Sequence, residues 1–204
     1  MHDLIPNAPL HLASGSRARR DLLRGAGLVF TAGPADVDED AIKATCQKKD
    51  CDAAGTALAL AREKASVASI PARDGYVLGC DQVLDLGGRL LSKATTRTDA
   101  FETLNALQGR PHRLQSAASI FGDGKEVWHT VSVATLTMHP FTPDALHTYL
   151  DATWPSVSDA VGCYHLEGRG VRLFSGIEGD FFTVLGLPLL EILAFLRREG
   201  GLGP

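Results

Sequence analysis

An α/β fold with a mixed sheet is predicted by two features of the sequence. Short apolar runs typical of strands alternate with segments of helical spacing through most of the 204 residues. Residues 114–138 are rich in β-branched side chains in alternating positions, around a glycine-containing turn at 122–125, and this pattern predicts a long antiparallel hairpin. Antiparallel pairs of that length argue against a purely parallel, doubly wound sheet.

The other strands and helices are expected to be short. Further strands are predicted at residues 9–13, 29–32, 76–81, 83–86, 89–91 and 171–177. Helices are predicted from residue 16 to a glycine at 25 or 27, over 52–69, from 99 to 109, from 142 and from 188. Ser16 is the expected cap of the first helix, and Asp99 with Glu102 resembles a capping box. Residues 34–40 are expected to form an acidic loop.

The composition is that of an ordinary globular protein. Hydrophobic residues make up 45% of the chain and charged residues 22%, with a formal net charge of −4. A protein that grips a nucleic-acid polymer is expected to have a basic face and a high pI, whereas the pI here is near 5.9. The most apolar stretch, residues 184–196, contains Pro188 and Glu191 and is shorter than the roughly 20 residues that a membrane span needs.

One domain over residues 1–204 is the expected organisation, because no linker-like change in composition interrupts the chain. The first residues lack the basic and then apolar pattern of a secretory signal. The cysteines show no C-x-x-C spacing, which argues against a zinc ribbon or a thioredoxin-type site. Reduced thiols and a cytoplasmic location are the simplest interpretation.

A candidate anion site lies in the segment Ser14-Gly-Ser-Arg-Ala-Arg-Arg20, between a predicted strand and a predicted helix. Free backbone N–H groups and the positive end of the helix dipole, together with Arg17, Arg19 and Arg20, suit a phosphate. A helix whose surface happens to be basic is the competing interpretation. The G-x-x-x-x-G-K-[ST] and G-x-G-x-x-G motifs are missing, which argues against a P-loop nucleotidase and an ordinary dinucleotide binder.

Two carboxylates are candidates for chemistry. Asp81 follows an apolar run and is predicted to stand at the carboxyl end of a strand, where ligands bind in open α/β sheets. A carboxylate there can bind a divalent cation or accept a proton from water, while an aspartate that caps a turn is the competing interpretation. Glu39 is the second candidate, and a solvated loop charge is its alternative.

Three further charged residues have both a functional and an ordinary interpretation. Lys64 and Lys93 can bind phosphate, or they can be solvated lysines of a helix and a loop. Glu167 precedes a glycine-rich turn, where its carboxylate can accept two hydrogen bonds from the edge of a nucleobase or remain in water.

Five sequence blocks, taken in order, resemble the Maf family of nucleotide pyrophosphatases. They are residues 12–23 (LASGSRARRDLL), 37–39 (VDE), 60–65 (LAREKA), 79–82 (GCDQ) followed by Lys93, and 185–189 (LGLPL). The resemblance implies an α/β fold of the Maf/ITPase-like kind, with an elongated mixed sheet flanked by helices and two lobes around a central cleft. The family is commonly dimeric, so the resemblance also admits a homodimer.

The resemblance further implies a metal-dependent hydrolase that converts a nucleoside triphosphate to the monophosphate and pyrophosphate. Asp81 would be the catalytic proton acceptor. Phosphate or cleft contacts are implied at Ser14, Ser16, Arg19, Glu39, Lys64 and Lys93. A divalent cation, Mg²⁺ or Mn²⁺, would be the cofactor, and Asp81 and Glu39 would be its ligands. The expected partner is thus a small nucleotide, with no nucleic-acid polymer and no membrane.

Three positions that the family associates with substrate choice fall on Ala18, Gln82 and Glu167. The pair Gln82 and Glu167 resembles the branch that acts on 7-methyl-GTP, whereas a dTTP/UTP branch would have Thr and Gln there. Ala18 stands where that branch has Trp, which removes a stacking face for the base. The alternatives are a dTTP/UTP or broad-specificity nucleotide pyrophosphatase, and a non-catalytic nucleotide-binding regulator of septum formation.

Overall fold

The computed structural model describes residues 9–69 and 75–199, and the strands within these ranges form one mixed sheet of seven strands. The strands are β1 (Leu10–Ala13), β2 (Thr31–Gly33), β3 (Tyr76–Leu86), β4 (Arg89–Leu91), β5 (Pro111–Gly122), β6 (Lys125–Met138) and β7 (Phe174–Glu178). Their order is β2-β1-β3-β5-β6-β7, and β4 pairs with β3 outside this path. β1 is parallel to β2 and β3, whereas every other pair is antiparallel, so the predicted mixed α/β class is confirmed.

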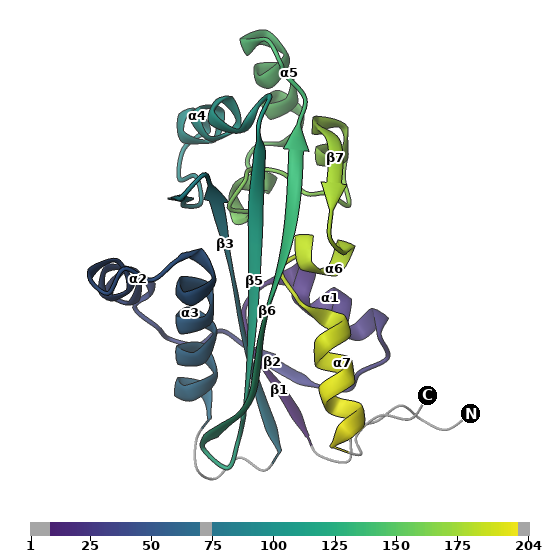
Figure 1. Ribbon diagram of the computed structural model, residues 1–204. Coiled ribbons are helices and arrows are strands. Elements are labelled where there is room, and N and C mark those ends of the chain that lie inside the picture. Colours follow the sequence, from purple (N-terminus) through teal and green to yellow (C-terminus); the bar gives the residue numbers. More distant parts are fainter. Residues whose placement is uncertain (1–8, 70–74, 200–204) are drawn as a thin grey trace.

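Helices surround this sheet at both ends. They are α1 (Arg17–Gly25), α2 (Glu39–Lys48), α3 (Ala53–Ala68), α4 (Arg97–Leu107), α5 (Pro143–Thr153), α6 (Phe181–Val184) and α7 (Leu189–Arg198), with 3-10 helices at Ser156–Asp159 and Arg169–Leu173. Figure 1 shows β3, β5 and β6 running along the molecule, with α4 and α5 at one end and α1, α2, α3 and α7 around the other. No helix within the described ranges has the length and apolar content needed to cross a membrane.

Each end of the molecule has its own cluster of buried hydrophobic side chains. At the α4–α5 end, Leu104, Leu136 and Leu146 are fully buried in one cluster. At the other end, Leu23 of α1 and Ile192 of α7 are fully buried in a second cluster against β1 and β3. Each such buried side chain stabilises the fold by roughly 1.5–3 kcal/mol relative to exposure. The long strands therefore connect two cores, as the implied two-lobed architecture requires.

β3 differs from the prediction in a way that matters for the site. The sequence predicts two strands, with Asp81 ending the first, but β3 runs unbroken from Tyr76 to Leu86 and Asp81 lies in its middle. The pairing with β5 continues through this point, since Asp81 is opposite Ala117 and Asp85 is opposite Arg113. The polar pair Asp81 and Gln82 interrupts the apolar sequence pattern, but the hydrogen-bonded pairing of β3 with β5 continues through both residues.

Other local details of the structure also differ from the prediction. The capping box of α4 is formed by Thr96 and Asp99, one turn before the predicted pair of Asp99 and Glu102. The predicted strand at 171–177 is divided into a 3-10 helix that ends at Leu173 and β7. The expected acidic loop ends in α2, because the Asp38 side chain accepts a hydrogen bond from the Ala41 N–H and starts a helix there. The predicted strand at 29–32 is displaced to β2.

Candidate functional site

α3 lies directly on β3 because Gly79 has no side chain. A Cβ atom on Gly79 would stand 2.1 Å from the carbonyl oxygen of Ala61 and 2.6 Å from the backbone nitrogen of Ala65. This close approach places Lys64 of α3 beside Asp81, which points to the same face of the strand two residues later. The glycine of the Gly-Cys-Asp-Gln block thus positions a catalytic candidate through packing.

Lys64 joins two carboxylates. Its Nζ lies 2.6 Å from Asp81 Oδ1 and 2.7 Å from Glu39 Oε1, and the Lys64 and Asp81 side chains are 13% and 10% exposed. A carboxylate this buried needs a charged partner, which Lys64 supplies. Asp81 Oδ2 makes no hydrogen bond to any residue that the structure describes, so one oxygen is fixed while the other remains available.

Glu39 is surrounded by cations. Partial burial raises the pKa of Glu39, but the hydrogen bond and charge of Lys64 outweigh it, with further contributions from Lys43 and Lys93, and the pKa lies below its usual range. The Lys43 Nζ is 3.6 Å from Glu39 Oε2. The structure therefore joins three of the predicted residues, Glu39, Lys64 and Asp81, by ion pairs, while Lys93 acts on Glu39 through its charge without an ion pair among the described residues.

The turn that leads into α1 forms a second group. Ser16 is the N-cap as predicted, and its side chain accepts a hydrogen bond from the Arg19 N–H. Ser14 is buried, and its Oγ accepts hydrogen bonds from the Ser16 N–H and from Arg19 Nη1, both at 3.2 Å. The two serines thus fix the turn, while the N–H groups of Arg17 and Ala18 have no acceptor among the described residues.

Arg19 is the most buried cation of this turn, with only 9% of its surface exposed. Its Nε donates to the Gly186 carbonyl at 2.8 Å, and its Nη1 donates to the Cys80 carbonyl at 2.9 Å. No carboxylate in the described ranges forms an ion pair with it. A buried guanidinium without a counter-charge, at a helix N-terminus, is the electrostatic environment that attracts an anion.

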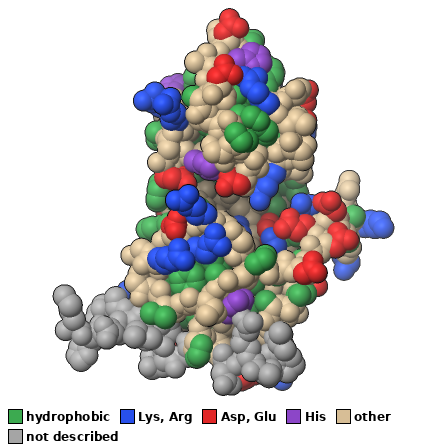
Figure 2. All heavy atoms as spheres, turned by 180° about the vertical axis from the view of Figure 1, so that it is seen from behind, with side chains coloured by type: hydrophobic (Ala, Val, Ile, Leu, Met, Phe, Trp, Pro, Cys, Tyr) green, Lys and Arg blue, Asp and Glu red, His purple; other side chains and the backbone are tan. Residues whose placement is uncertain are grey.

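These two groups meet at the middle of β3. Ala13 is paired with Gly79 in parallel register, so the turn at 14–16 lies beside Cys80 and Asp81. The bond from Arg19 to the Cys80 carbonyl confirms this placement. Figure 2 shows Lys and Arg side chains gathered at mid-height of the molecule with acidic side chains beside them.

Gln82 points to the sheet face opposite to that of Asp81, since successive side chains of a strand alternate. Its Nε2 donates to Ser116 Oγ and to the Thr183 carbonyl, both at 2.9 Å, and to the Val184 carbonyl at 3.2 Å. All hydrogen bonds of this amide that the structure describes therefore use the nitrogen, and Oε1 remains as an acceptor.

The loop after α6 is shaped by Gly186, which has a φ of +90°. That backbone conformation favours glycine, and it turns the Gly186 carbonyl toward Arg19. The Leu-Gly-Leu-Pro block near the end of the chain thus contributes to the anion site at its beginning.

The structure does not bring every predicted residue into this centre. Ala18 is half-buried in the first turn of α1. Glu167 is exposed ahead of the 3-10 helix at Arg169–Leu173, and it has no hydrogen-bond or ion-pair partner among the described residues. The geometry therefore unites the predicted phosphate and catalytic residues, and Glu167 makes no hydrogen bond or ion pair with them in the part of the chain that the structure describes.

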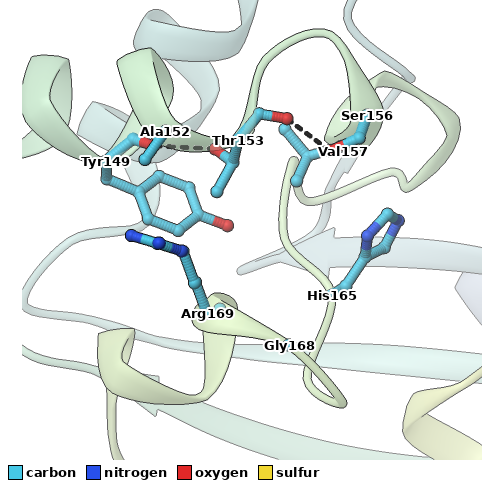
Figure 3. Close-up of a pocket in the computed structure, with 9 residues that line it drawn as sticks. Tyr149, Ala152, Thr153, Ser156, Val157, His165, Gly168 and Arg169 are labelled. Carbon is cyan, nitrogen blue, oxygen red and sulfur yellow. Dashed lines mark hydrogen bonds between the residues drawn. The ribbon is translucent and has the colours of Figure 1, made fainter.

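A cavity of about 210 Å³ is lined in part by Gly168, the residue that follows Glu167 in the sequence. None of the predicted site residues lines this cavity. Figure 3 shows Tyr149 and Thr153 of α5 on one side of it and Arg169 and His165 on the other. His165 Nε2 is 2.6 Å from Asp159 Oδ1, so this nitrogen on the cavity wall already has a partner. This cavity belongs to the α5 end of the molecule.

No group of three or more His, Cys, Asp or Glu side chains in the described part of the chain is arranged to hold a metal ion. Glu39 and Asp81, the expected ligands, instead share Lys64. Two carboxylates and no more are typical of Mg²⁺ sites that substrate phosphates complete, so the donor set fits a hard cation bound together with its substrate.

Two residues that shape the site, Ser116 and Thr183, carry little sequence signal of that role. Ser116 and Thr183 anchor Gln82, yet hydroxyls in buried segments look like ordinary strand or helix residues. Gly79 and Gly186 are more visible, because a glycine within a strand pattern, or in a loop, suggests a close approach or a special φ.

The chain is similar to several known proteins. The chain is 46% identical over 195 residues to nucleoside triphosphate pyrophosphatase 1 of Jannaschia sp., covering 96% of this chain and 98% of that protein. It is 43% identical over 191 residues to a 7-methyl-GTP pyrophosphatase of Rhizobium etli, covering 94% and 96%. A solved nucleoside-triphosphatase (dITP/XTP pyrophosphatase) of Mycobacterium abscessus aligns over 93% of both chains at 14% identity, with a TM-score of 0.41. The pattern of the family described as Maf-like protein matches residues 9–199, and the chain therefore belongs to the Maf family.

Proposed function

We propose that this protein hydrolyses a nucleoside triphosphate to the nucleoside monophosphate and pyrophosphate. The observation that supports it best is the placement of Asp81, which is held by Lys64 beside the anion-binding turn of Ser14 to Arg19. Relatives that share nearly the whole length of the chain are named nucleoside triphosphate pyrophosphatases.

The cations of the site suit a triphosphate chain of about four negative charges, which fixed positive groups stabilise most where water is excluded. In this proposal the start of α1 and Arg19 bind one part of the chain through backbone N–H groups and the buried guanidinium. Lys64 and Lys93 bind from the α3 side of β3. The phosphates would thereby lie across the middle of β3.

Asp81 is the proposed general base. Lys64 fixes Oδ1, so Oδ2 can accept the proton of a water molecule whose oxygen bonds to the α-phosphorus. The bond from the α-phosphorus to the bridging oxygen then breaks, and pyrophosphate leaves with the electron pair. A general base of this kind contributes roughly 10²–10⁴ in rate.

Glu39 and Asp81 are the residues proposed to hold a divalent cation, Mg²⁺ or Mn²⁺, with the phosphates of the substrate as further ligands. Such an ion supplies charge neutralisation of the transferring phosphoryl group. Lys64 lies within hydrogen-bond distance of both carboxylates, and its hydrogen bond and charge lower the pKa of Glu39.

We propose 7-methyl-GTP as the favoured substrate. The support is the pair Gln82 and Glu167, together with the similarity to the Rhizobium etli protein of that name. Guanine presents two adjacent donors, N1–H and N2–H₂, and methylation at N7 makes the ring cationic, so a carboxylate such as Glu167 favours it. The small side chain of Ala18 leaves no aromatic face to stack on this base.

The test is a panel of unmodified and methylated nucleoside triphosphates, each incubated with the purified chain and Mg²⁺ or Mn²⁺, with pyrophosphate and monophosphate measured. Equimolar release of both products, with 7-methyl-GTP turned over fastest, is the expected result. A fastest rate with dTTP or UTP would overturn the substrate proposal and leave the reaction intact. Tight nucleotide binding without turnover would overturn the reaction and favour a regulatory protein.

A further inference from the structure

A pair of cysteines lies at the end of α2, outside the proposed site. Cys46 is buried in the last turn of α2, and Cys51 is exposed just beyond it. All four cysteines of the chain are within the described ranges, and none forms a disulfide in this structure. The spacing of five residues gives no recognised sequence motif, so the proximity of this pair comes from the fold.

The backbone between the two cysteines forms a Schellman motif. Asp50 has a φ of +53°, the Cys51 N–H donates to the Cys46 carbonyl at 3.0 Å, and the Asp50 N–H donates to the Gln47 carbonyl at 3.3 Å. In this motif the side chains at the two positions occupied here by Cys46 and Cys51 usually touch. The hydrogen bond between their backbones keeps their Cα atoms within about 7 Å, which is the range that a disulfide requires.

The surroundings of the thiols agree with this contact. Burial raises the pKa of Cys46 above its usual range, and the neighbouring Cys51 thiol raises it further, whereas Thr56 and Lys49 lower it. Cys46 is therefore protonated and shielded, while Cys51 is open to solvent. An exposed thiol beside a buried one matches the division of roles between a reacting and a resolving cysteine.

We propose that Cys46 and Cys51 are a modification site at which a hydroperoxide oxidises the two thiols to a reversible disulfide. With hydrogen peroxide, the Cys51 sulfur, as thiolate, attacks one peroxide oxygen, the O–O bond breaks, and Cys51 becomes a sulfenic acid. The other oxygen leaves as hydroxide and takes up the proton that the Cys51 thiol released, which gives the first water. The Cys46 sulfur then attacks the Cys51 sulfur and the S–O bond breaks. The leaving hydroxide takes the Cys46 proton as a second water. The two sulfurs supply the two electrons that reduce the peroxide, and a dithiol reductant reverses the change.

The disulfide would close a short ring over the C-terminal turn of α2. Glu39 lies at the other end of this helix, which packs mainly against α3. The proposal concerns the modification itself, and its readouts are independent of whether the chain hydrolyses nucleotides.

The experiment treats the reduced, full-length protein with hydrogen peroxide and measures its intact mass, followed by digestion with trypsin. A loss of about 2 Da per disulfide is expected, reversed by dithiothreitol. Lys48 and Lys49 lie between the cysteines, so cleavage there yields two peptides that remain joined only by a Cys46–Cys51 bond. The buried Cys80 and Cys163 are internal references that should stay unmodified.

Variants separate the roles of the two thiols. In Cys46→Ser the sulfenic acid on Cys51 has no resolving partner, so the 2 Da loss should disappear and a dione probe should label Cys51. Cys51→Ser should show neither the 2 Da loss nor the label. Asp50→Gly preserves the left-handed turn and should retain disulfide formation, while Asp50→Val opposes that φ and should slow it. An unchanged mass, a bond between two chains, or a disulfide that involves Cys80 or Cys163 would overturn the proposal.

Discussion

Asp81 is a carboxylate kept in the middle of a buried strand by one ammonium group. Lys64 binds one of its oxygens and also binds Glu39, so the three charges form a connected network. The arrangement gives each single substitution a distinct expected result, because removing a carboxylate leaves Lys64 paired, whereas removing Lys64 leaves both carboxylates without it.

The first prediction concerns Asp81→Asn. We expect pyrophosphate release to fall by ~10²–10⁴, because an amide cannot accept the proton. The fold should persist, since Lys64 retains Glu39 as a partner. Steady-state rates together with thermal unfolding measure both effects. Asp85→Asn is the matched control, because Asp85 is another buried aspartate of β3 that caps the turn at Gly88. Near-normal turnover by Asp81→Asn would remove Asp81 from the mechanism.

The second prediction concerns the ionisation of Glu39 in Lys64→Met. Burial alone would raise the pKa of Glu39, and the loss of the Lys64 hydrogen bond and charge removes the main opposing causes, so the pKa should rise. A carboxyl titration followed by NMR measures it. Lys43→Met, which removes the longer contact of 3.6 Å, should produce a smaller rise. Equal rises in the two variants would contradict the central position given to Lys64.

The third prediction concerns Glu167→Gln. An amide presents one acceptor and one donor where the carboxylate presents two acceptors, so it suits guanine less well. The ratio of kcat/KM for 7-methyl-GTP over UTP should therefore fall, and the panel of triphosphates measures it. Because Glu167 is exposed and has no partner among the described residues, stability should change by no more than ~0.5 kcal/mol. An unchanged ratio would exclude Glu167 from base selection.

At the scale of elements, the contact between α3 and β3 decides whether the network forms. The fourth prediction is that Gly79→Ala destabilises the protein by ~1–3 kcal/mol, because its methyl group would overlap the Ala61 carbonyl. Turnover should fall as well, since α3 must shift and Lys64 moves with it. Gly176→Ala in β7, where a Cβ meets nothing within 4 Å, is the control and should stay near wild type. Denaturant unfolding and rates on both variants provide the measurement.

The elements that could be predicted from the sequence are those with local signals. The N-caps Ser16 and Thr142 and the helical spacing of residues 53–68 mark α1, α5 and α3. β3 could not be predicted as one strand, because the partner that stabilises its buried Asp81 comes from another element. The arrangement of Cys46 and Cys51 was equally hidden, since it depends on the left-handed conformation of Asp50.

The residues of the candidate site also divide into those that the sequence could group and those that it could not. Ser14, Ser16 and Arg19 could be predicted to act together, because one strand–turn–helix segment contains all of them. Lys64 and Asp81 are far apart in sequence, and only the resemblance to a family united them before the fold was known. No sequence pattern indicates that Gln82 is anchored by Thr183, because that contact joins segments about half the chain length apart.

At the scale of the whole molecule, the core at the α4–α5 end contains a buried histidine. His112 is 1% exposed, its Nε2 lies 2.8 Å from the Tyr164 hydroxyl, and its Nδ1 has no hydrogen-bond partner within the described ranges. Burial lowers the pKa of His112 to about 4. The neutral imidazole therefore belongs to the folded state, whereas the unfolded chain takes up a proton near its ordinary pKa.

The fifth prediction follows from this difference. Since the unfolded state binds more protons between pH 6.5 and pH 4, stability should fall as the pH drops through this window, by up to about 3 kcal/mol in total. His112→Gln retains a polar contact to Tyr164 without titrating, so its stability should depend less on pH there. Urea unfolding at a series of pH values measures the slopes. Identical slopes for the two proteins would contradict the assignment to His112.

The bond from Arg19 to the Gly186 carbonyl has a consequence for biosynthesis. It joins α1 to the loop before α7, so the proposed anion-binding turn lacks part of its support until residue 186 has left the ribosome. Nascent chains lengthen by roughly 5–20 residues per second, and earlier segments begin to fold while later ones are still being made. A growing polypeptide should therefore complete the proposed phosphate site late in translation, and prematurely terminated products should bind nucleotides more weakly than the full chain.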